Sequence, residues 1–376
     1  MQIIEVQTEA ELKRFIDLPW MIYRANSAWT PPLKQEVRDK LDPRKHPFYR
    51  HGWAAKFLAV KDGRDVGRIL VADDPRYNEQ NKTNTGCFGF FESVDDSNVS
   101  NALFAHAAKV LKSRGRDHMF GPMEYSTNYE CGTLIDGFEY PQRVMMPYNP
   151  PYYQTLYEKA GFSKNRDLYC WWFDRISDPS QKWRPLLDRF SQRYGVTIRP
   201  FEMNDFDNEV ARCMSVYDTM RNRWWWSCVT LTRDEINYLA ASLRLIANPG
   251  HIYIAEDNGK TVGFSVTIPD VNEAIRPLNG SLSWCGIPYL GVPRLMWRLR
   301  RVKNARVAIL CVLPEYQRRG VGERLILQTI EYGIRVLDYD GAELGWTDEL
   351  NDKVNKVITR VGGKRYKTYR VYEKEL

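Results

Sequence analysis

Short runs of alternating apolar and polar residues are separated along this chain by segments of helical periodicity. Residues 3–6 alternate as a strand does. They are followed by a Thr8-x-x-Glu11 capping box and by apolar residues at helical spacing. Residues 57–69 read as two strands joined by an Asp-Gly turn, which is the signal of a β-hairpin. Strands that alternate with helices in this way predict a mixed α/β sheet.

The same order of elements occurs a second time. Residues 252–265 repeat the hairpin of residues 57–69, with alanine, glycine and valine at matching positions. Each copy then ends in an Asn-led helix and an aromatic strand. We therefore predict fold class α/β (α+β), with two tandem domains that are each a mixed, mostly antiparallel sheet flanked by helices. The predicted units are residues 1–175, a linker helix over 176–195, and residues 196–376.

One segment of the second copy predicts a binding site for phosphate groups. A buried strand at residues 307–312 runs into Pro314, a Gln-x-x-Gly-x-Gly turn and an apolar helix. Gly320 and Gly322 would let backbone N–H groups approach a pyrophosphate, and the start of the following helix would add its positive end. Arginines add charge-assisted hydrogen bonds, and they stand at Arg318, Arg319 and Arg324.

The combination of strand, Val-x-Pro and Gln-x-x-Gly-x-Gly turn resembles the pyrophosphate loop of the GNAT superfamily of acyl-CoA N-acyltransferases. The hairpins and Asn-led helices are also similar to GNAT elements, so the whole chain resembles a tandem GNAT protein. This resemblance implies that acyl-CoA is the donor. The cofactor-binding residues it implies are Cys311, Val312 and Leu313 at the thioester, Gln317, Arg318, Arg319, Gly320, Val321, Gly322 and Arg324 at the pyrophosphate, and Asn351.

The first copy departs from this pattern. After its corresponding strand come Ser93-Val-Asp-Asp-Ser-Asn, with acids where phosphate-binding groups should stand. We expect this half not to bind the cofactor.

Catalytic groups are harder to assign. Many GNAT proteins have a tyrosine seven residues after the helix-opening Asn, but here that position is Ile358. Tyr369, Tyr366 or Tyr372 could supply the acid, or the reaction needs no acid. The base could be Glu343 or Glu349, which flank the strand beside the thioester, or Glu130, although carboxylates in such positions are more often solvated or structural.

The acceptor pocket is expected in two places. The polar stretch 121–132 with residues 145–151 could bind it, through Asn128 and Tyr148, or could be a turn-rich connection. Trp224, Trp225 and Trp226 follow the first helix of the second copy. Because three adjacent tryptophans cannot all face one helix interface, at least one should line a pocket or lie at the surface.

Composition narrows the partners. The net charge of +7 suits an anionic cofactor or an acidic lipid surface, and zinc-finger and RNA-binding signatures are absent from the sequence, so we expect no nucleic acid. The seven cysteines form no C-x-x-C pair, and the N-terminus shows no signal-peptide pattern. These features predict a cytoplasmic protein without a metal.

Two features favour a lipid acceptor. Residues 292–303 place Val292, Leu295, Met296, Leu299 and Val302 at helical spacing, with Arg294, Arg298 and Arg301 away from them. This pattern is typical of a helix on an anionic membrane, or of an ordinary amphipathic helix. Segments at 126–132, 145–153 and 367–374 also resemble a tandem-GNAT group of bacterial ceramide synthases, which implies a sphingoid-type amine. An acetyltransferase for a small polar amine and a non-catalytic acyl-CoA sensor remain alternatives.

Overall fold

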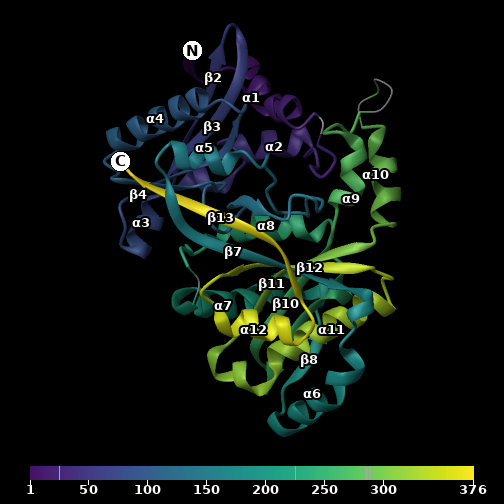
Figure 1. Ribbon diagram of the computed structural model, residues 1–376. Coiled ribbons are helices and arrows are strands. Elements are labelled where there is room, and N and C mark those ends of the chain that lie inside the picture. The colour runs from purple at the N-terminus through teal and green to yellow at the C-terminus, as the bar shows by residue number, and fades with distance from the viewer. Residues whose placement is uncertain (25, 225, 284–286, 288) are drawn as a thin grey trace.

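The computed structural model describes residues 1–24, 26–224, 226–283, 287 and 289–376. Its strands form one continuous mixed sheet that runs through both halves of the chain (Figure 1). The strand order is β1-β2-β3-β4-β5-β13-β7-β12-β11-β10-β9-β8, with β6 paired to β13. All pairs are antiparallel except β4–β5 and β11–β12. The predicted fold class is confirmed.

We call residues 1–175 the first half and residues 196–376 the second half. The strands of the first half are β1 (Gln2–Glu5), β2 (Trp53–Lys61), β3 (Arg64–Asp73), β4 (Thr85–Ser93), β5 (His118–Gly121), β6 (Thr133–Asp136) and β7 (Ser163–Asp174). Its helices are α1 (Glu9–Ile22), α2 (Lys34–Leu41), α3 (Pro75–Asn81), α4 (Ser97–Ser113) and α5 (Tyr153–Lys159), with a short 3₁₀ turn η1 (Pro47–Arg50).

The second half repeats the plan. Its strands are β8 (Thr197–Pro200), β9 (Ile252–Asp257), β10 (Lys260–Pro269), β11 (Asn304–Val312), β12 (Gly341–Asp348) and β13 (Lys364–Glu375). Its helices are α7 (Phe206–Trp224), α8 (Arg233–Arg244), α9 (Asn272–Ile275), α10 (Gly291–Leu299), α11 (Val321–Arg335) and α12 (Asp352–Arg360). The 3₁₀ turns are η3 (Met203–Asp205), η4 (Pro249–His251), η5 (Arg276–Leu278) and η6 (Pro314–Arg319).

The connection between the halves contains η2 (Arg175–Ser177) and α6 (Ser180–Tyr194). A helix is therefore present within the predicted linker, residues 176–195, and it runs from Ser180 to Tyr194. It also packs against α11, through an ion pair between Arg184 and the buried Glu331. The division of the chain into two domains at this helix stays a prediction.

Local signals read from the sequence formed as expected. The capping box of Thr8 and Glu11 is present at the start of α1. Both hairpin turns have two consecutive residues in the left-handed region, at Asp62-Gly63 and Asn258-Gly259. Glycine and Asx residues adopt this conformation at low cost, which is why the Asp-Gly and Asn-Gly pairs marked the turns.

The Asn-led helix of the first half differs from its expectation. Asn149 does not cap α5, which begins at Tyr153 after Pro150 and Pro151. Its side chain instead accepts a hydrogen bond from the N–H of Leu134 and donates to the carbonyl of the same residue. Asn149 therefore fixes the edge strand β6, and only Asn351 caps its predicted helix.

The two closing aromatic strands, β7 and β13, each pair with a strand of the other half. The C-terminal strand β13 lies between β5 and β7, where Tyr372 pairs with Gly121 and Tyr369 pairs with Leu168. In turn β7, from the first half, pairs with β12 of the second half. Figure 1 shows these strands running through the middle of the molecule. Because each half is completed by a strand of the other, the sheet does not end at the boundary predicted from the sequence.

Candidate functional site

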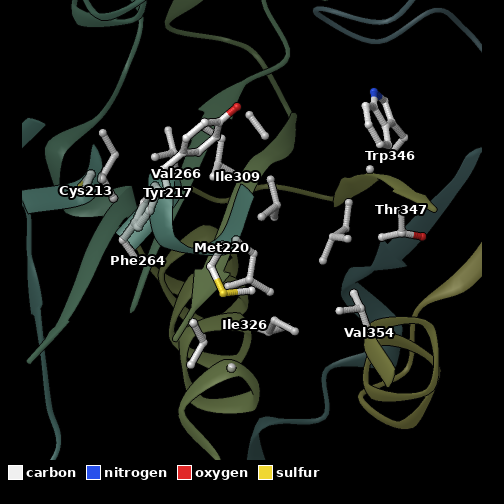
Figure 2. Close-up of a pocket in the computed structure, with 18 of the residues that line it drawn as sticks. Cys213, Tyr217, Met220, Phe264, Val266, Ile309, Ile326, Trp346, Thr347 and Val354 are labelled. Carbon is white, nitrogen blue, oxygen red and sulfur yellow. The ribbon is translucent and has the colours of Figure 1, made fainter. Parts of the chain in front are cut away.

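A cavity of about 1120 Å³ opens in the second half. Figure 2 shows side chains of α7, β10 and β11 on one side of it, with Trp346, Thr347 and Val354 facing them across the gap. Its walls come from α6, α7, α8, β10, β11, α11, β12 and α12, and residues 127–129 of the first half close one edge. The cavity is thus formed jointly by both halves.

Divergence of two parallel strands creates this space. β11 and β12 pair only from Asn304 with Gly341 to Val307 with Leu344. Beyond that point β11 pairs with β10 alone, up to Cys311 and Val312. In residues 308–312, the backbone N–H and C=O groups on the β12 side of β11 therefore have no neighbouring strand and face the cavity. They can form hydrogen bonds with an extended substrate. This is the segment that the resemblance assigns to the thioester.

The predicted phosphate loop lies at one end of the cavity. The amide of Gln317 donates to the Val312 carbonyl over 3.1 Å, which closes the turn η6. Gly320 follows with a φ of 72° and is the cap from which α11 starts. A side chain is disfavoured at that φ, so glycine there allows close approach to the N-terminus of α11. Gln317, Arg318, Gly320 and Gly322 all line the cavity.

The other cofactor residues expected from the sequence divide into three groups. Val312 and Asn351 line the cavity, and the Asn351 side chain caps α12. Cys311, Leu313 and Val321 are buried in the core. Arg319 lies over the Tyr316 ring at 4.5 Å and Arg324 donates to the Val196 carbonyl, so these two arginines are turned toward the protein.

The far end of the cavity is apolar. Helices α7 and α8 line this end, and the Arg244 guanidinium of α8 lies 5.0 Å from the Phe206 ring of α7. The apolar lining residues of the two helices are Phe206, Val210, Met214, Ile236, Leu239, Ala240 and Leu243. The linker helix α6 adds Trp183 and Leu187 to the cavity wall, but it packs against α11 and η6, beside the phosphate loop. Polar groups of the lining include the Tyr217 hydroxyl and the Cys228 thiol. The Tyr217 hydroxyl donates to Asn128 Oδ1 over 2.8 Å, and the Cys228 sulfur lies 3.4 Å from the same oxygen.

Among the described residues, the carboxylates that line the cavity are Glu323 and Asp348. Glu323 is in the first turn of α11, beside the phosphate loop. Asp348 ends β12, and its Oδ1 accepts from the Leu350 N–H and lies 3.4 Å from Arg166. The neighbouring Thr347 hydroxyl donates to Asn355 over 2.7 Å. Asp348 is therefore a carboxylate of the cavity lining that also contacts Arg166 of the first half.

The carboxylates proposed from the sequence lie outside the lining. Glu343 is fully buried, with Arg306 at 3.4 Å and the Tyr366 hydroxyl donating to it. Its neighbour Leu344 lines the cavity, so alternation along β12 turns Glu343 to the opposite face. Glu349 accepts from the Asp167 N–H and pairs with Lys164, which indicates a structural contact.

Glu130 and Tyr369 are also held in the protein interior. Lys40 lies 3.2 Å from both Glu130 and Glu124, and forms a compact ion cluster with them. Burial, opposed by Lys40, raises the pKa of Glu124 to about 7. Tyr369 is fully buried on β13, and burial raises the pKa of its hydroxyl well above the ordinary value. The structure therefore does not bring the four candidate catalytic residues together.

The acceptor candidates are separated in the same way. Asn128 lines the cavity, whereas the Tyr148 hydroxyl donates to the Phe138 carbonyl and packs beside Tyr23. Trp226 lines the cavity, with the Arg166 guanidinium 5.5 Å from its ring. Trp225 lies outside the described residues, as does the side chain of Trp224.

The equivalent loop of the first half differs in the way its sequence suggested. Asp96 caps α4 with its own carboxylate, which accepts from the Asn98 N–H, and it pairs with Lys61. A carboxylate in this position competes with a phosphate for the helix N-terminus. This geometry supports the expectation that only the second half binds the cofactor.

Sequence reasoning missed several polar residues of the cavity, among them Tyr217, Thr347 and Asp348. Tyr217 lies within the helical pattern of α7, and Thr347 and Asp348 end a strand, so nothing local marks them as functional. A usable signal existed for Asp348, because it stands between the predicted strand and the helix-opening Asn351. Among the described residues no group of three His, Cys, Asp or Glu could hold a metal, and no described helix is long and apolar enough to cross a membrane.

Comparison with known proteins places this geometry in a family. Residues 217–362 match the acetyltransferase (GNAT) family, a region that contains the phosphate loop and most of the cavity wall. The chain is 34% identical over 384 residues to the bacterial ceramide synthase of Caulobacter vibrioides, covering 100% of this chain and 98% of that protein. It is 35% identical over 379 residues to protein YghO of Escherichia coli, covering 97% and 93%.

Solved structures agree on the fold. A tandem GNAT protein from the clavulanic acid biosynthesis pathway superimposes with a TM-score of 0.54 at 13% identity, covering 100% of this chain and 98% of that one. A GCN5-related N-acetyltransferase from Sphaerobacter thermophilus gives 0.54 at 13% identity, with 99% and 95% covered. The chain therefore belongs to the GNAT acyltransferases, as a tandem-GNAT relative of bacterial ceramide synthase.

Proposed function

We propose that this protein transfers a long-chain acyl group from acyl-CoA to the amine of a lipid, such as a sphingoid base. The observation that carries the proposal is the cavity of about 1120 Å³, which joins the phosphate loop to an apolar end between α7 and α8. A site for acetyl-CoA and a small amine does not need such a volume. Each methylene buried there adds about 0.8 kcal/mol, so a palmitoyl chain gains far more than an acetyl group.

The donor fits the residues present. The pyrophosphate would bind at Gln317–Gly322, the thioester beside the unpaired edge of β11, and the alkyl chain along α7 and α8. Acyl-CoA supplies the activated carbonyl, and the chain's own residues hold it in the space where β11 and β12 separate.

We expect direct transfer to the amine. Burial raises the pKa of the Cys311 thiol well above its ordinary value, so this cysteine stays a thiol and is a poor nucleophile. The nitrogen of the neutral amine attacks the thioester carbonyl, the carbon–sulfur bond breaks, and coenzyme A leaves as a thiolate that takes up a proton from water. The amine nitrogen loses one proton, which we assign to Asp348, a carboxylate of the cavity lining. Asp348→Asn should then lower kcat more than it changes KM.

Similarity to bacterial ceramide synthase supports the lipid acceptor. Asn128 and Trp226 supply one polar and one aromatic contact at the edge of the cavity nearest the first half. A sphingoid base has a polar head and a long apolar chain, which matches a mixed lining of this kind.

We also propose that the protein binds the surface of an anionic membrane, and that α10 makes the contact. The sequence predicted one apolar face of Val292, Leu295, Met296, Leu299 and Val302. In the structure Val302 is buried and Leu295 and Leu299 are half-buried, whereas Met296 and Trp297 are each 52% exposed. Tyr289 is 73% exposed, and the Arg301 guanidinium lies 3.7 Å from the Trp297 ring. Aromatic and basic side chains together suit the surface of an acidic bilayer, where each arginine is worth about 1 kcal/mol.

Vesicle sedimentation tests the membrane contact. The protein should bind vesicles of equal parts phosphatidylglycerol and phosphatidylcholine, but not phosphatidylcholine alone. Met296→Ser with Trp297→Ser should abolish binding. The control Val336→Ser, at a position 62% exposed at the end of α11, should leave binding unchanged. Equal binding by both variants would remove α10 from the proposal.

Product analysis tests the activity. Purified protein is incubated with a sphingoid base and acyl-CoAs of rising chain length, and amides are quantified by mass spectrometry. The proposal predicts rates that rise from acetyl-CoA to palmitoyl-CoA. A preference for acetyl-CoA and a polar amine would favour the small-molecule acetyltransferase, and binding without any product would favour the sensor.

A further inference from the structure

The segment at residues 226–232 forms a wall of the cavity, and we call it the wall segment. It joins α7 to α8, and it places Trp226, Cys228 and Leu231 in the lining. Both flanking helices line the cavity as well. Because the wall segment connects the two helices that line the apolar end, its position constrains how α7 and α8 lie relative to each other.

Helix α3 of the first half binds this segment directly. Arg76 donates to the Thr230 carbonyl over 2.8 Å, and Asn81 donates to the Cys228 carbonyl over 3.3 Å. The hydroxyl groups of Tyr77 and Ser227 are hydrogen-bonded to each other. Gln80 accepts from both the N–H and the hydroxyl of Thr230, at 2.9 and 3.0 Å. Arg76 and Gln80, one turn apart, thus both contact Thr230, whereas Tyr77 and Asn81, also one turn apart, contact Ser227 and Cys228.

Residues 127 and 128 of the first half also bind the wall segment. Thr127 donates to the Ser227 carbonyl over 2.8 Å, and Asn128 donates to the Val229 carbonyl over 2.9 Å. Ser227 has a φ of 55°, a left-handed conformation that is unusual for a residue with a side chain. The first half bonds the carbonyls of Ser227 and of the next two residues, Cys228 and Val229, so it stabilises the local conformation that a free loop would avoid.

The start of α8 is fixed by the same half. Glu235 closes the capping box with Thr232 and is 2% exposed. The Tyr129 hydroxyl donates to Glu235 over 3.2 Å, and His51 Nε2 lies 3.5 Å from its other oxygen. The wall segment is therefore bound by the first half along its whole length, from Ser227 to the first turn of α8.

From these contacts we infer that α3 of the first half is a specificity-determining element, which positions the wall segment and thereby selects the acyl chain. The first half, which has the Asp96 helix cap in place of a phosphate loop, would then help to shape the donor site of the second half. This inference rests on the proposed long-chain transfer. Tyr77, Arg76 and Asn81 are positioning residues, since they contact the wall and not the cavity.

Tyr77→Phe is the sharpest test, because it removes one hydroxyl from a residue that is 8% exposed. Loss of a hydrogen bond of about 1 kcal/mol corresponds to about fivefold in the measured ratio. We expect kcat/KM for palmitoyl-CoA relative to octanoyl-CoA to fall by about this factor. Ser227→Ala should reproduce the effect, and the double variant should add little to either.

Tyr152→Phe is the matched control. Its hydroxyl donates to the Ser93 carbonyl over 2.8 Å, entirely within the first half, so the same chemical change should leave the chain-length ratio unchanged. Affinity for free coenzyme A, measured by calorimetry, should be unchanged in both variants, since the phosphate loop is not involved.

Hydrogen exchange separates this inference from the proposed function. Tyr77→Phe should speed amide exchange in residues 226–235, whichever acyl-CoA the protein uses, and Tyr152→Phe should not. Arg76→Met, which removes a second contact, should give the same result if Tyr77→Phe folds poorly. Unchanged exchange and an unchanged ratio in Tyr77→Phe would overturn the inference. A wild-type enzyme without preference for long chains would instead overturn the proposed function.

Discussion

Replacing Ala240 by tryptophan should shorten the acyl chain that the cavity accepts. Ala240 is a half-buried residue of α8 that lines the apolar end of the cavity, next to Leu239 and Leu243. An indole ring built at this position projects into the space where we place the end of the alkyl chain. Alanine to tryptophan is well tolerated by a helix, so α8 itself should still form.

The magnitude follows from the methylenes that the ring displaces. If it excludes about four methylenes at about 0.8 kcal/mol each, about 3 kcal/mol of binding free energy is lost. That corresponds to about 200-fold in affinity. A shorter acyl chain that ends before α8 loses none of it. The ratio of kcat/KM for palmitoyl-CoA to that for octanoyl-CoA should therefore fall by up to this factor.

The neighbouring residue offers the control. Ala241 lies on the exposed side of the same helix and outside the cavity lining, so Ala241→Trp makes the same substitution without filling the channel. Steady-state kinetics with acyl-CoAs of rising length compares both variants with the wild type. If Ala240→Trp keeps the wild-type chain-length profile, the alkyl chain does not lie against α8 and the assignment of the channel is wrong.

Three further predictions concern the loop, the thiol and an ion pair. Gly320→Val should weaken coenzyme A binding at least tenfold by calorimetry, because φ of 72° excludes a branched side chain; unchanged affinity would place the pyrophosphate elsewhere. Cys311→Ala should retain most activity, and an acylated cysteine in the wild type would refute direct transfer. Burial lowers the pKa of His51, but Asp74 and Glu235 outweigh it and raise that pKa to about 9. The charged His51 should therefore stabilise the fold fully below roughly pH 6.5, and up to about 3 kcal/mol should be lost as pH rises through about 9. Urea unfolding of His51→Gln should lack this change.

The elements of the fold were predictable because their signals are local. The capping box of Thr8, the turns at Gly63 and Gly259 and the cap Asn351 each depend on a few adjacent residues, and each formed as expected. The crossing of β7 and β13 was not predictable in this way. Both strands have the same aromatic, alternating pattern, so their sequences do not state which half each one completes.

The site was predictable where backbone conformation decides it and not where side-chain direction does. Gln317, Gly320 and Gly322 reach the cavity because the turn requires their residue types. Glu343 was proposed from its place on β12, but strand alternation turns it away from the cavity, whereas Asp348 lies in the lining. A one-residue difference in strand phase reverses such an assignment, and the sequence alone does not fix that phase.

The most direct test of the central claim is an experimental structure with a non-reactive palmitoyl-CoA analogue. The claim is that one cavity holds the whole donor, from the phosphate loop to the helices α7 and α8. We predict the pyrophosphate at Gln317–Gly322, the thioester position beside residues 308–312, and the alkyl chain between Phe206 and Leu243. An alkyl chain that leaves the cavity toward solvent, or a coenzyme A bound at the first half near Asp96, would contradict the account.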